Sequence, residues 1–337
     1  MSRTRRVIKS RALYEVSFRA VNTIPLVCAD YMNVLLRSIL ARVQRDQKVL
    51  LHHFVFEGSH AHILCTALDA NQCRKFYGEV KKQITEAVKC LMGIERLSLW
   101  EDRPGVILVP TYEDAVAKIV YIYANPSNDC LEDSIDAYPG VTSWDGFLQA
   151  LGENGLRYAH SRAVPWIRLG MIPKLPSGGA VTERQDRFLA EKMLEDAKRR
   201  GHSFILYPNA WMASVSGCVE EDFIAETNRE ILRRLRSVEA HNREQRLKAG
   251  KQVMGVYRLK TQQILKPHTP KMRGIQIFVH SQFKDVRIQI IQERKVIEAE
   301  CREVYERWKC GDFSRPWPPG TFPPPVPVLV NLLQDYS

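Results

Sequence analysis

The order of hydrophobic patterns between residues 12 and 109 restricts the fold more than any other feature of the sequence. Segments in which apolar and polar residues alternate predict strands, and segments with apolar residues three or four apart predict helices. The resulting order of strand, helix, strand, strand, helix and strand is that of a ferredoxin-like α+β unit, an antiparallel sheet with helices on one side. The expected strands are residues 12–20, 48–56, 59–67 and 94–99. Residues 106–109 continue the last strand or form a further short one. The expected helices are residues 30–45, capped by Asp30, and residues 69–91.

One further helix is expected directly after this unit. Thr111 is a suitable N-cap, and Asp114 stands in the box position three residues later. The apolar pattern continues to about Ala124. The helix should end near Asn125, because Pro126 disfavours the helical conformation at the residue before it.

The second half of the chain has a different character. Prolines interrupt residues 156–180, which are expected to form a linker. Beyond it, residues 182–200, 220–248 and 286–308 have helical patterns, residues 275–280 are a candidate strand, and the proline-rich end should run extended. We therefore expect a first domain at residues 1–155 that contains the α+β unit, a linker at 156–180, and a mainly helical basic C-terminal region at 181–337.

The charge of the chain is concentrated in this second half. The formal net charge is +11, and residues 229–273 alone contain 13 basic and 3 acidic residues. A concentrated excess of this kind is typical of a surface that binds a polyanion. No apolar run is long enough for a membrane helix. The eight cysteines contain no Cys-x-x-Cys pair, which argues against a zinc ribbon and favours reduced thiols in a cytoplasmic protein.

His60 and His62 stand two residues apart in the third expected strand. Side chains at this spacing point to the same face, so both imidazoles can reach one divalent metal ion. Glu57, in the expected turn before this strand, is an alternative third ligand. Taken alone, a His-x-His pair is more often structural than metal-binding.

Tyr121 and Asn125 are four residues apart and share a face of the helix that begins near Thr111. A phenol that faces a metal-bound phosphate can act as a covalent nucleophile, and the Asn125 amide oxygen can be a third metal ligand. Each residue also has an ordinary structural explanation, as a core aromatic side chain and as a residue at a helix end.

Four segments together resemble the REP-associated tyrosine transposases, which are single-tyrosine HUH (His, hydrophobic, His) nucleases. Residues 54–64 resemble the HUH strand of that family, and residues 120–126 resemble its Tyr-Ile-His-Leu-Asn-Pro helix end. Residues 14–26 are similar to its first strand and loop, and residues 138–144 to a later Tyr-x-Trp-Ser-Ser segment. The resemblance covers about residues 10–150. Gly58 and Ser59 replace the usual Pro-Asn, and Tyr123 replaces a histidine.

The resemblance implies a bacterial, nucleoid-associated enzyme that cuts and rejoins single-stranded DNA beside a hairpin. It implies Tyr121 as the nucleophile, a 5′-phosphotyrosine intermediate, and Mg²⁺ or Mn²⁺ bound by His60, His62 and Asn125. No nucleotide cofactor is implied, because the phosphotyrosine conserves the energy of the broken bond. The protein would act as a monomer or homodimer. A DNA-hairpin-binding or regulatory protein that does not cut is the alternative, and an RNA-binding module is a more distant one.

Non-specific DNA affinity is expected from the basic C-terminal region, because phosphate contacts and base stacking use cations and aromatic rings together. A solvated basic surface is the competing explanation. The residues expected to contact DNA are Arg233, Arg234, Arg236, Lys248, Lys251, Tyr257, Arg258 and Lys260.

Overall fold

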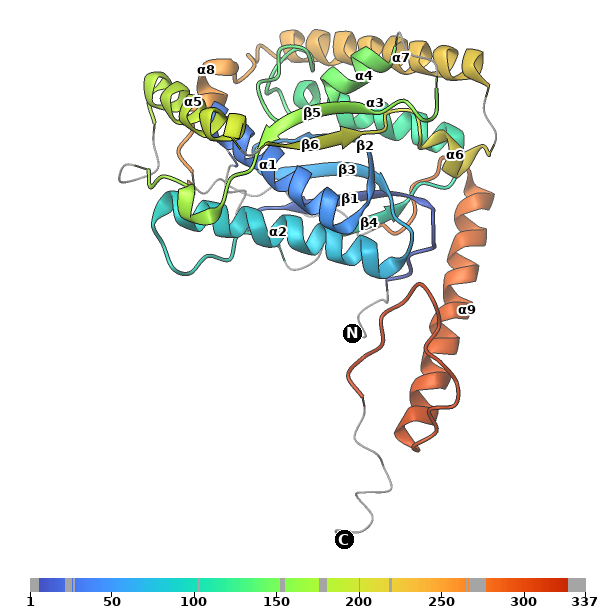
Figure 1. Cartoon of the computed structure of the whole chain (residues 1–337). Coiled ribbons are helices and arrows are strands. Elements are labelled where there is room, and N and C mark those ends of the chain that lie inside the picture. The colour runs from blue at the N-terminus through green and yellow to red at the C-terminus, as the bar shows by residue number, and fades with distance from the viewer. Residues whose placement is uncertain are drawn as a thin grey trace.

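The computed structural model describes residues 6–21, 26, 28–101, 104–151, 155–175, 181–199, 201–217, 220–264, 266 and 277–326. Figure 1 shows a central sheet with helices around it, and helix α9 extends away from this body. Within the described residues, every helix is too short or too polar to span a bilayer.

A four-stranded antiparallel sheet forms the centre of the fold. Its strands are β1 (Leu13–Arg19), β2 (Leu50–Phe56), β3 (His60–Thr66) and β4 (Gly105–Leu108), in the order β2-β3-β1-β4. Helix α1 (Asp30–Gln47) connects β1 to β2, and α2 (Ala70–Met92) connects β3 to β4. This chain order and strand order confirm the predicted ferredoxin-like α+β unit.

The two faces of the sheet are covered by different helices. Alternate residues of β1, namely Tyr14, Val16 and Phe18, are buried in the core that α1 and α2 share with the sheet. The opposite face packs on α3 (Tyr112–Asn128) through Leu13 and its neighbours on β2 and β3. Helix α3 in turn packs along α7 (Glu221–Lys248). The predicted metal and nucleophile residues lie on this α3 face.

The prediction of a strand at residues 94–99 is wrong, whereas the alternative of a separate short strand at 106–109 is confirmed by β4, Gly105–Leu108. The earlier segment makes a single bridge to the sheet, between Trp100 and Ala20. The Trp100 indole donates a hydrogen bond to the Lys81 carbonyl on α2 at 2.9 Å, and its ring meets Phe18 edge-on. These contacts fix Trp100 against the middle of α2, and residues 105–108 are the ones that pair with β1.

Helix α3 begins as predicted, since the Thr111 side chain accepts a hydrogen bond from the Asp114 amide. Its predicted end near Asn125 is wrong, because the helix continues through Pro126 to Asn128. The Ser127 hydroxyl donates to the Ala124 carbonyl at 2.9 Å, which satisfies one carbonyl group near the proline. The helix is therefore one turn longer than the proline suggests.

Asp30 does not cap α1, contrary to the prediction. The N-cap residue is Ala29, and no side chain of its own caps the helix. Asp186 of α5 (Glu183–Arg199) accepts hydrogen bonds from the Asp30 and Tyr31 amides at 2.9 and 3.0 Å. The first turn of α1 is thus stabilised by a distant carboxylate, which also attaches α5 to the ferredoxin-like unit.

The rest of the chain is mainly helical, as predicted, with one small sheet. Strand β5 (His160–Pro165) lies in the predicted linker and pairs antiparallel with β6 (Gly201–Leu206). Residues 275 and 276 of the candidate strand lie outside the described residues, and Val279 bridges Leu108 of β4. The three-way domain division stays a prediction. The remaining elements are α4 (Trp144–Ala150), a 3-10 turn at Leu169–Met171, α6 (Met212–Val215), α8 (Val256–Thr261) and α9 (Lys284–Lys309).

Candidate metal and nucleophile site

His60 and His62 lie on the α3 face of the sheet, as their spacing on β3 predicts. Their ring centroids are 5.2 Å apart. The strand register places His62 opposite Ser17 of β1, and Glu15 is the diagonal neighbour on the same face. Sequence analysis did not identify Glu15, because nothing in the local pattern shows which strand pairs with β3.

Glu15 connects His62 to a buried lysine. Its carboxylate lies 2.6 Å from Nδ1 of His62 and 2.8 Å from Nζ of Lys118 on α3, and all three side chains are largely buried. Burial opposes ionisation of Glu15, but the hydrogen bond from His62 and the nearby Lys118 charge lower the pKa of Glu15 well below its usual range. An imidazole with Nδ1 bound to a carboxylate presents Nε2 to a metal, which is the usual arrangement around metal-ligating histidines.

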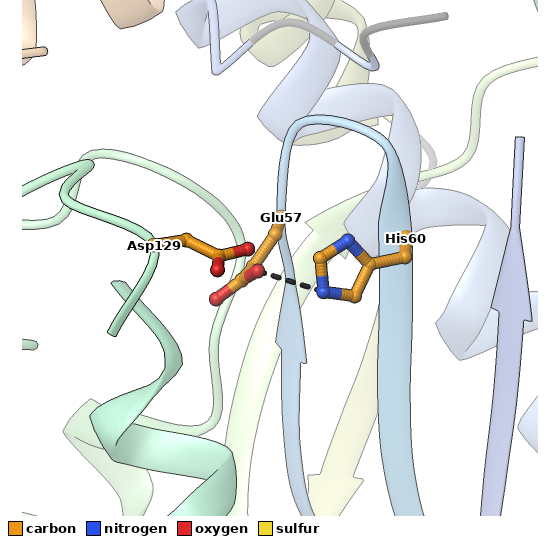
Figure 2. A group of neighbouring side chains, drawn as sticks. All are labelled: Glu57, His60 and Asp129. Atoms are coloured by element: carbon orange, nitrogen blue, oxygen red, sulfur yellow. Dashed lines mark ion pairs between the residues drawn. The ribbon is translucent and has the colours of Figure 1, made fainter. Parts of the chain in front are cut away.

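Glu57, His60 and Asp129 form a compact group of potential metal ligands (Figure 2). One ligand atom from each lies within 4.8 Å of the others. Glu57 is 1% exposed and lies 2.9 Å from Nε2 of His60, yet neither of its oxygens accepts a hydrogen bond within the described residues. A buried carboxylate in this state, beside an imidazole and a second carboxylate, fits a divalent cation such as Mn²⁺ or Mg²⁺.

Glu57 was the alternative third ligand in the sequence analysis, whereas Asp129 was missed. Asp129 follows the last turn of α3, four residues after Asn125 and eight after Tyr121. A predicted helix that continued through Pro126 would have placed Asp129 on the same face as Tyr121 and Asn125. The signal was therefore present in the sequence, but the expected helix end concealed it.

Asn125 and His62 are not members of this compact group. Asn125 is buried at 4% exposure, and its Nδ2 atom has no hydrogen-bond partner within the described residues. Its role as a metal ligand, together with that of His62, stays a prediction. His60 is common to both ligand sets.

Tyr121 stands beside these side chains on α3. Its ring meets that of His62 edge-on with centroids 5.4 Å apart, and the Lys118 ammonium lies 4.8 Å from its centroid. The side chain remains 42% exposed. Burial raises the pKa of the Tyr121 phenol, and the carboxylates of Glu15, Glu57 and Asp129 raise it further. The phenol is therefore accessible but protonated at neutral pH.

Two neighbouring tyrosines have structural partners instead. The hydroxyl of Tyr123 lies 2.8 Å from Nδ1 of His53 and 2.9 Å from the Ser143 hydroxyl, and burial raises its pKa far above the usual range. The Tyr112 hydroxyl lies 2.8 Å from that of Thr227. Tyr123, which replaces the histidine of the resembling family, is therefore part of the core.

We expect Tyr123→Phe to lower the free energy of unfolding by about 1–3 kcal/mol, because buried partners lose their hydrogen bond. Chemical denaturation of the purified variant measures this effect. Any reaction at Tyr121 should persist at the wild-type rate. Loss of a covalent reaction with unchanged stability would instead identify Tyr123 as the reactive residue.

A cleft of about 190 Å³ opens next to the two histidines. Its walls come from β1, β3, β4 and the segment before β4, and they are lined by Ser17, Phe18, Arg19, His60, His62, Glu101 and Gly105. Arg19 supplies a cation to this lining and Glu101 supplies a carboxylate. The cleft therefore offers a small anionic group a place between a guanidinium and the imidazoles.

Most of the basic residues expected to contact DNA are paired with carboxylates of the same chain. Tyr257 is 66% exposed, and Lys251 is also exposed. Arg258 lines a separate groove. The contribution of all the residues expected to contact DNA stays a prediction. The ion pairs are Arg233 and Arg234 with Glu230, Arg236 with Asp136 and Glu239, Lys248 with Glu244, and Lys260 with Asp30.

Comparison with known proteins gives one structural likeness. No protein-family model and no curated protein matches the sequence. The chain is similar to a solved structure described as the REP-associated tyrosine transposase bound to a REP hairpin, with 18% sequence identity and a TM-score of 0.40. The match covers 52% of this chain and 100% of that one. Likeness at this level establishes neither family membership nor function.

Glu15 gives a direct test of how the site is assembled. We expect Glu15→Gln to weaken Mn²⁺ binding about 10- to 100-fold, because the carboxylate that orients His62 is lost. Titration calorimetry measures the affinity, and circular dichroism verifies folding. Glu113→Gln, an exposed substitution on α3, is the matched control. Equal affinities of the two variants would show that Glu15 has no part in metal binding.

Proposed function

We propose that this chain is a metal-dependent single-stranded DNA endonuclease and strand transferase that uses Tyr121 as its nucleophile. The observation that carries the proposal is the position of Tyr121. An exposed phenol lies edge-on to His62, on the sheet face that also contains the Glu57, His60 and Asp129 group. A nucleophile beside potential metal ligands and a cleft that contains the Arg19 guanidinium is an arrangement suited to phosphodiester transfer.

In the proposed reaction, the Tyr121 oxygen attacks the phosphorus of a phosphodiester in the cleft. The new bond joins the phenolic oxygen to phosphorus, and the bond from phosphorus to the 3′-oxygen breaks. The phenolic proton is lost to water, and the leaving 3′-oxygen takes up a proton from water. Arg19 binds a non-bridging oxygen and compensates its charge. A bound divalent cation would stabilise charge on the phosphoryl oxygens. The products are a 5′-phosphotyrosine and a free 3′-hydroxyl.

The same geometry supports rejoining. The phosphotyrosine retains the energy of the original bond, so a 3′-hydroxyl from the same or another strand can displace Tyr121 without a nucleotide cofactor. Lys118 lies 4.8 Å from the centre of the Tyr121 ring but is paired with Glu15, so Arg19 is the cation that stabilises the departing phenolate. Strand transfer and simple resealing differ only in which 3′-hydroxyl enters the cleft.

The experiment that tests this function looks for the covalent intermediate. The full-length protein is incubated with Mn²⁺ and a pool of labelled hairpins that have single-stranded tails of random sequence. A labelled band that migrates with the protein on a denaturing gel supports the proposal. DNA binding without any such band, in Mn²⁺ and in Mg²⁺, would instead identify a non-cleaving DNA-hairpin-binding protein.

A further inference from the structure

A second and larger groove of about 860 Å³ begins where the metal-ligand group ends. One wall contains Asp129 and Cys130, which follow α3. The other wall comes from the segment around α8 and includes Met254, Arg258 and Lys266. Asp129 therefore belongs both to the candidate metal group and to this groove, so the groove adjoins the candidate metal group.

The two walls are attached to each other by the backbone. The Met254 amide donates to the Cys130 carbonyl at 2.9 Å, and the Gly255 amide donates to the Leu131 carbonyl at 3.1 Å. Helix α8 is fixed to the body through Lys260, which pairs with Asp30 at 2.8 Å. These contacts hold the groove in a defined shape next to the cleft.

The charges in the groove differ from those elsewhere in the basic region. Arg233, Arg234 and Lys248 are exposed but paired with glutamates of α7. Arg258 and Lys266 are exposed and have no carboxylate partner within the described residues. Only cations that are not already compensated attract phosphate strongly, so these two residues are better placed for DNA than the charges on α7.

We propose that this groove binds the nucleotides of single-stranded DNA that adjoin the scissile phosphate. Arg258 and Lys266 contact their phosphates, and the amide side chains of Gln262 and Gln263 contact base edges. The volume suits a ligand of nucleotide size, since pockets for small molecules span roughly 300–1,000 Å³. The inference rests on the proposed function, because Asp129 joins the groove to the cleavage site.

The test compares two double variants in a Tyr121→Phe background, in which cleavage cannot alter the DNA. The probe is a labelled hairpin with an eight-nucleotide single-stranded tail, and fluorescence anisotropy gives its affinity across a salt series with Mn²⁺. Arg258→Ala with Lys266→Ala should weaken binding and make the log–log salt slope shallower by about 1.4, at about 0.7 per lost single-strand contact. Lys82→Ala with Arg307→Ala is the matched control and should leave the slope unchanged, because these exposed cations are paired with Glu79 and Glu303. Equal effects of the two pairs, or no change in either, would overturn the proposal.

Alkylation of Cys130 locates the DNA directly. Cys130 is a half-buried free thiol in the groove wall, whereas Cys310 is exposed at the end of α9. Bound DNA should protect Cys130 from iodoacetamide and leave Cys310 reactive, as measured by peptide mass spectrometry. Unchanged labelling of Cys130 at saturating DNA would contradict the proposal. Absence of an adduct in the protein with intact Tyr121 would contradict the proposed function without affecting either binding result.

Discussion

Tyr121→Phe is expected to abolish the covalent protein–DNA adduct and to lower strand cleavage by a factor on the order of 10³ or more, the range seen when a nucleophile is removed. Only the attacking oxygen is lost. The ring retains its edge-on contact with His62 and its position near Lys118, and within the described residues no hydrogen bond contributes to the pKa of the Tyr121 hydroxyl, which is 42% exposed as a side chain. No phosphate contact is changed by this substitution. Affinity for a labelled hairpin, measured by anisotropy, should therefore remain within about twofold of wild type.

Tyr123→Phe is the matched control for this variant. It removes the same atom two residues away from a buried network, so it should reduce stability and leave adduct formation intact. An adduct that persisted in Tyr121→Phe would show that another residue attacks the DNA. Loss of DNA affinity in parallel with loss of cleavage would show that Tyr121 acts in binding instead.

Removal of the metal ligands is the second change with a large expected effect. His60 belongs to both candidate ligand sets, so His60→Ala should weaken Mn²⁺ binding at least about 100-fold, since even second-shell changes cost 10- to 100-fold. A chelator should stop cleavage, and added Mn²⁺ should restore it. Titration calorimetry with Mn²⁺ measures the affinity without relying on activity. Full cleavage in excess chelator would contradict the metal assignment.

Two further variants decide which set of ligands binds the ion. Asp129→Asn removes a charge from the compact group, whereas Asn125→Ala removes the amide oxygen expected from the sequence. A larger loss of Mn²⁺ affinity in Asp129→Asn would identify Glu57, His60 and Asp129 as the ligands. A larger loss in Asn125→Ala would favour His60, His62 and Asn125. Both variants should lose less Mn²⁺ affinity than His60→Ala. Asp129→Asn keeps an oxygen ligand, and Asn125→Ala keeps both histidines.

The parts of the fold and site that could be predicted depend on local periodicity. Strand alternation correctly placed His60 and His62 on one face, and the order of elements predicted the ferredoxin-like unit that the sheet forms. Helical spacing placed Tyr121 and Asn125 on α3. Each of these inferences needs only residues a few positions apart.

The features that escaped prediction depend on contacts between distant segments. Glu15 meets His62 only because β1 pairs with β3, and Asp186 caps α1 from 156 positions away. Strand β5 lies in a proline-bounded stretch and is specified by its pairing with β6. Asp129 was missed for a different reason, because the expected effect of Pro126 placed the predicted end of the helix too early. Local rules therefore give the elements and miss the partners that complete the site.

The measurement that tests the central claim most directly is the identity of the residue attached to DNA. The adduct formed with Mn²⁺ is denatured, treated with nuclease and trypsin, and sequenced by mass spectrometry. The account predicts a nucleotide attached through a phosphotyrosine at Tyr121. A nucleotide on Tyr112, Tyr123 or any other residue, or a pool in which no peptide gains mass, would contradict it.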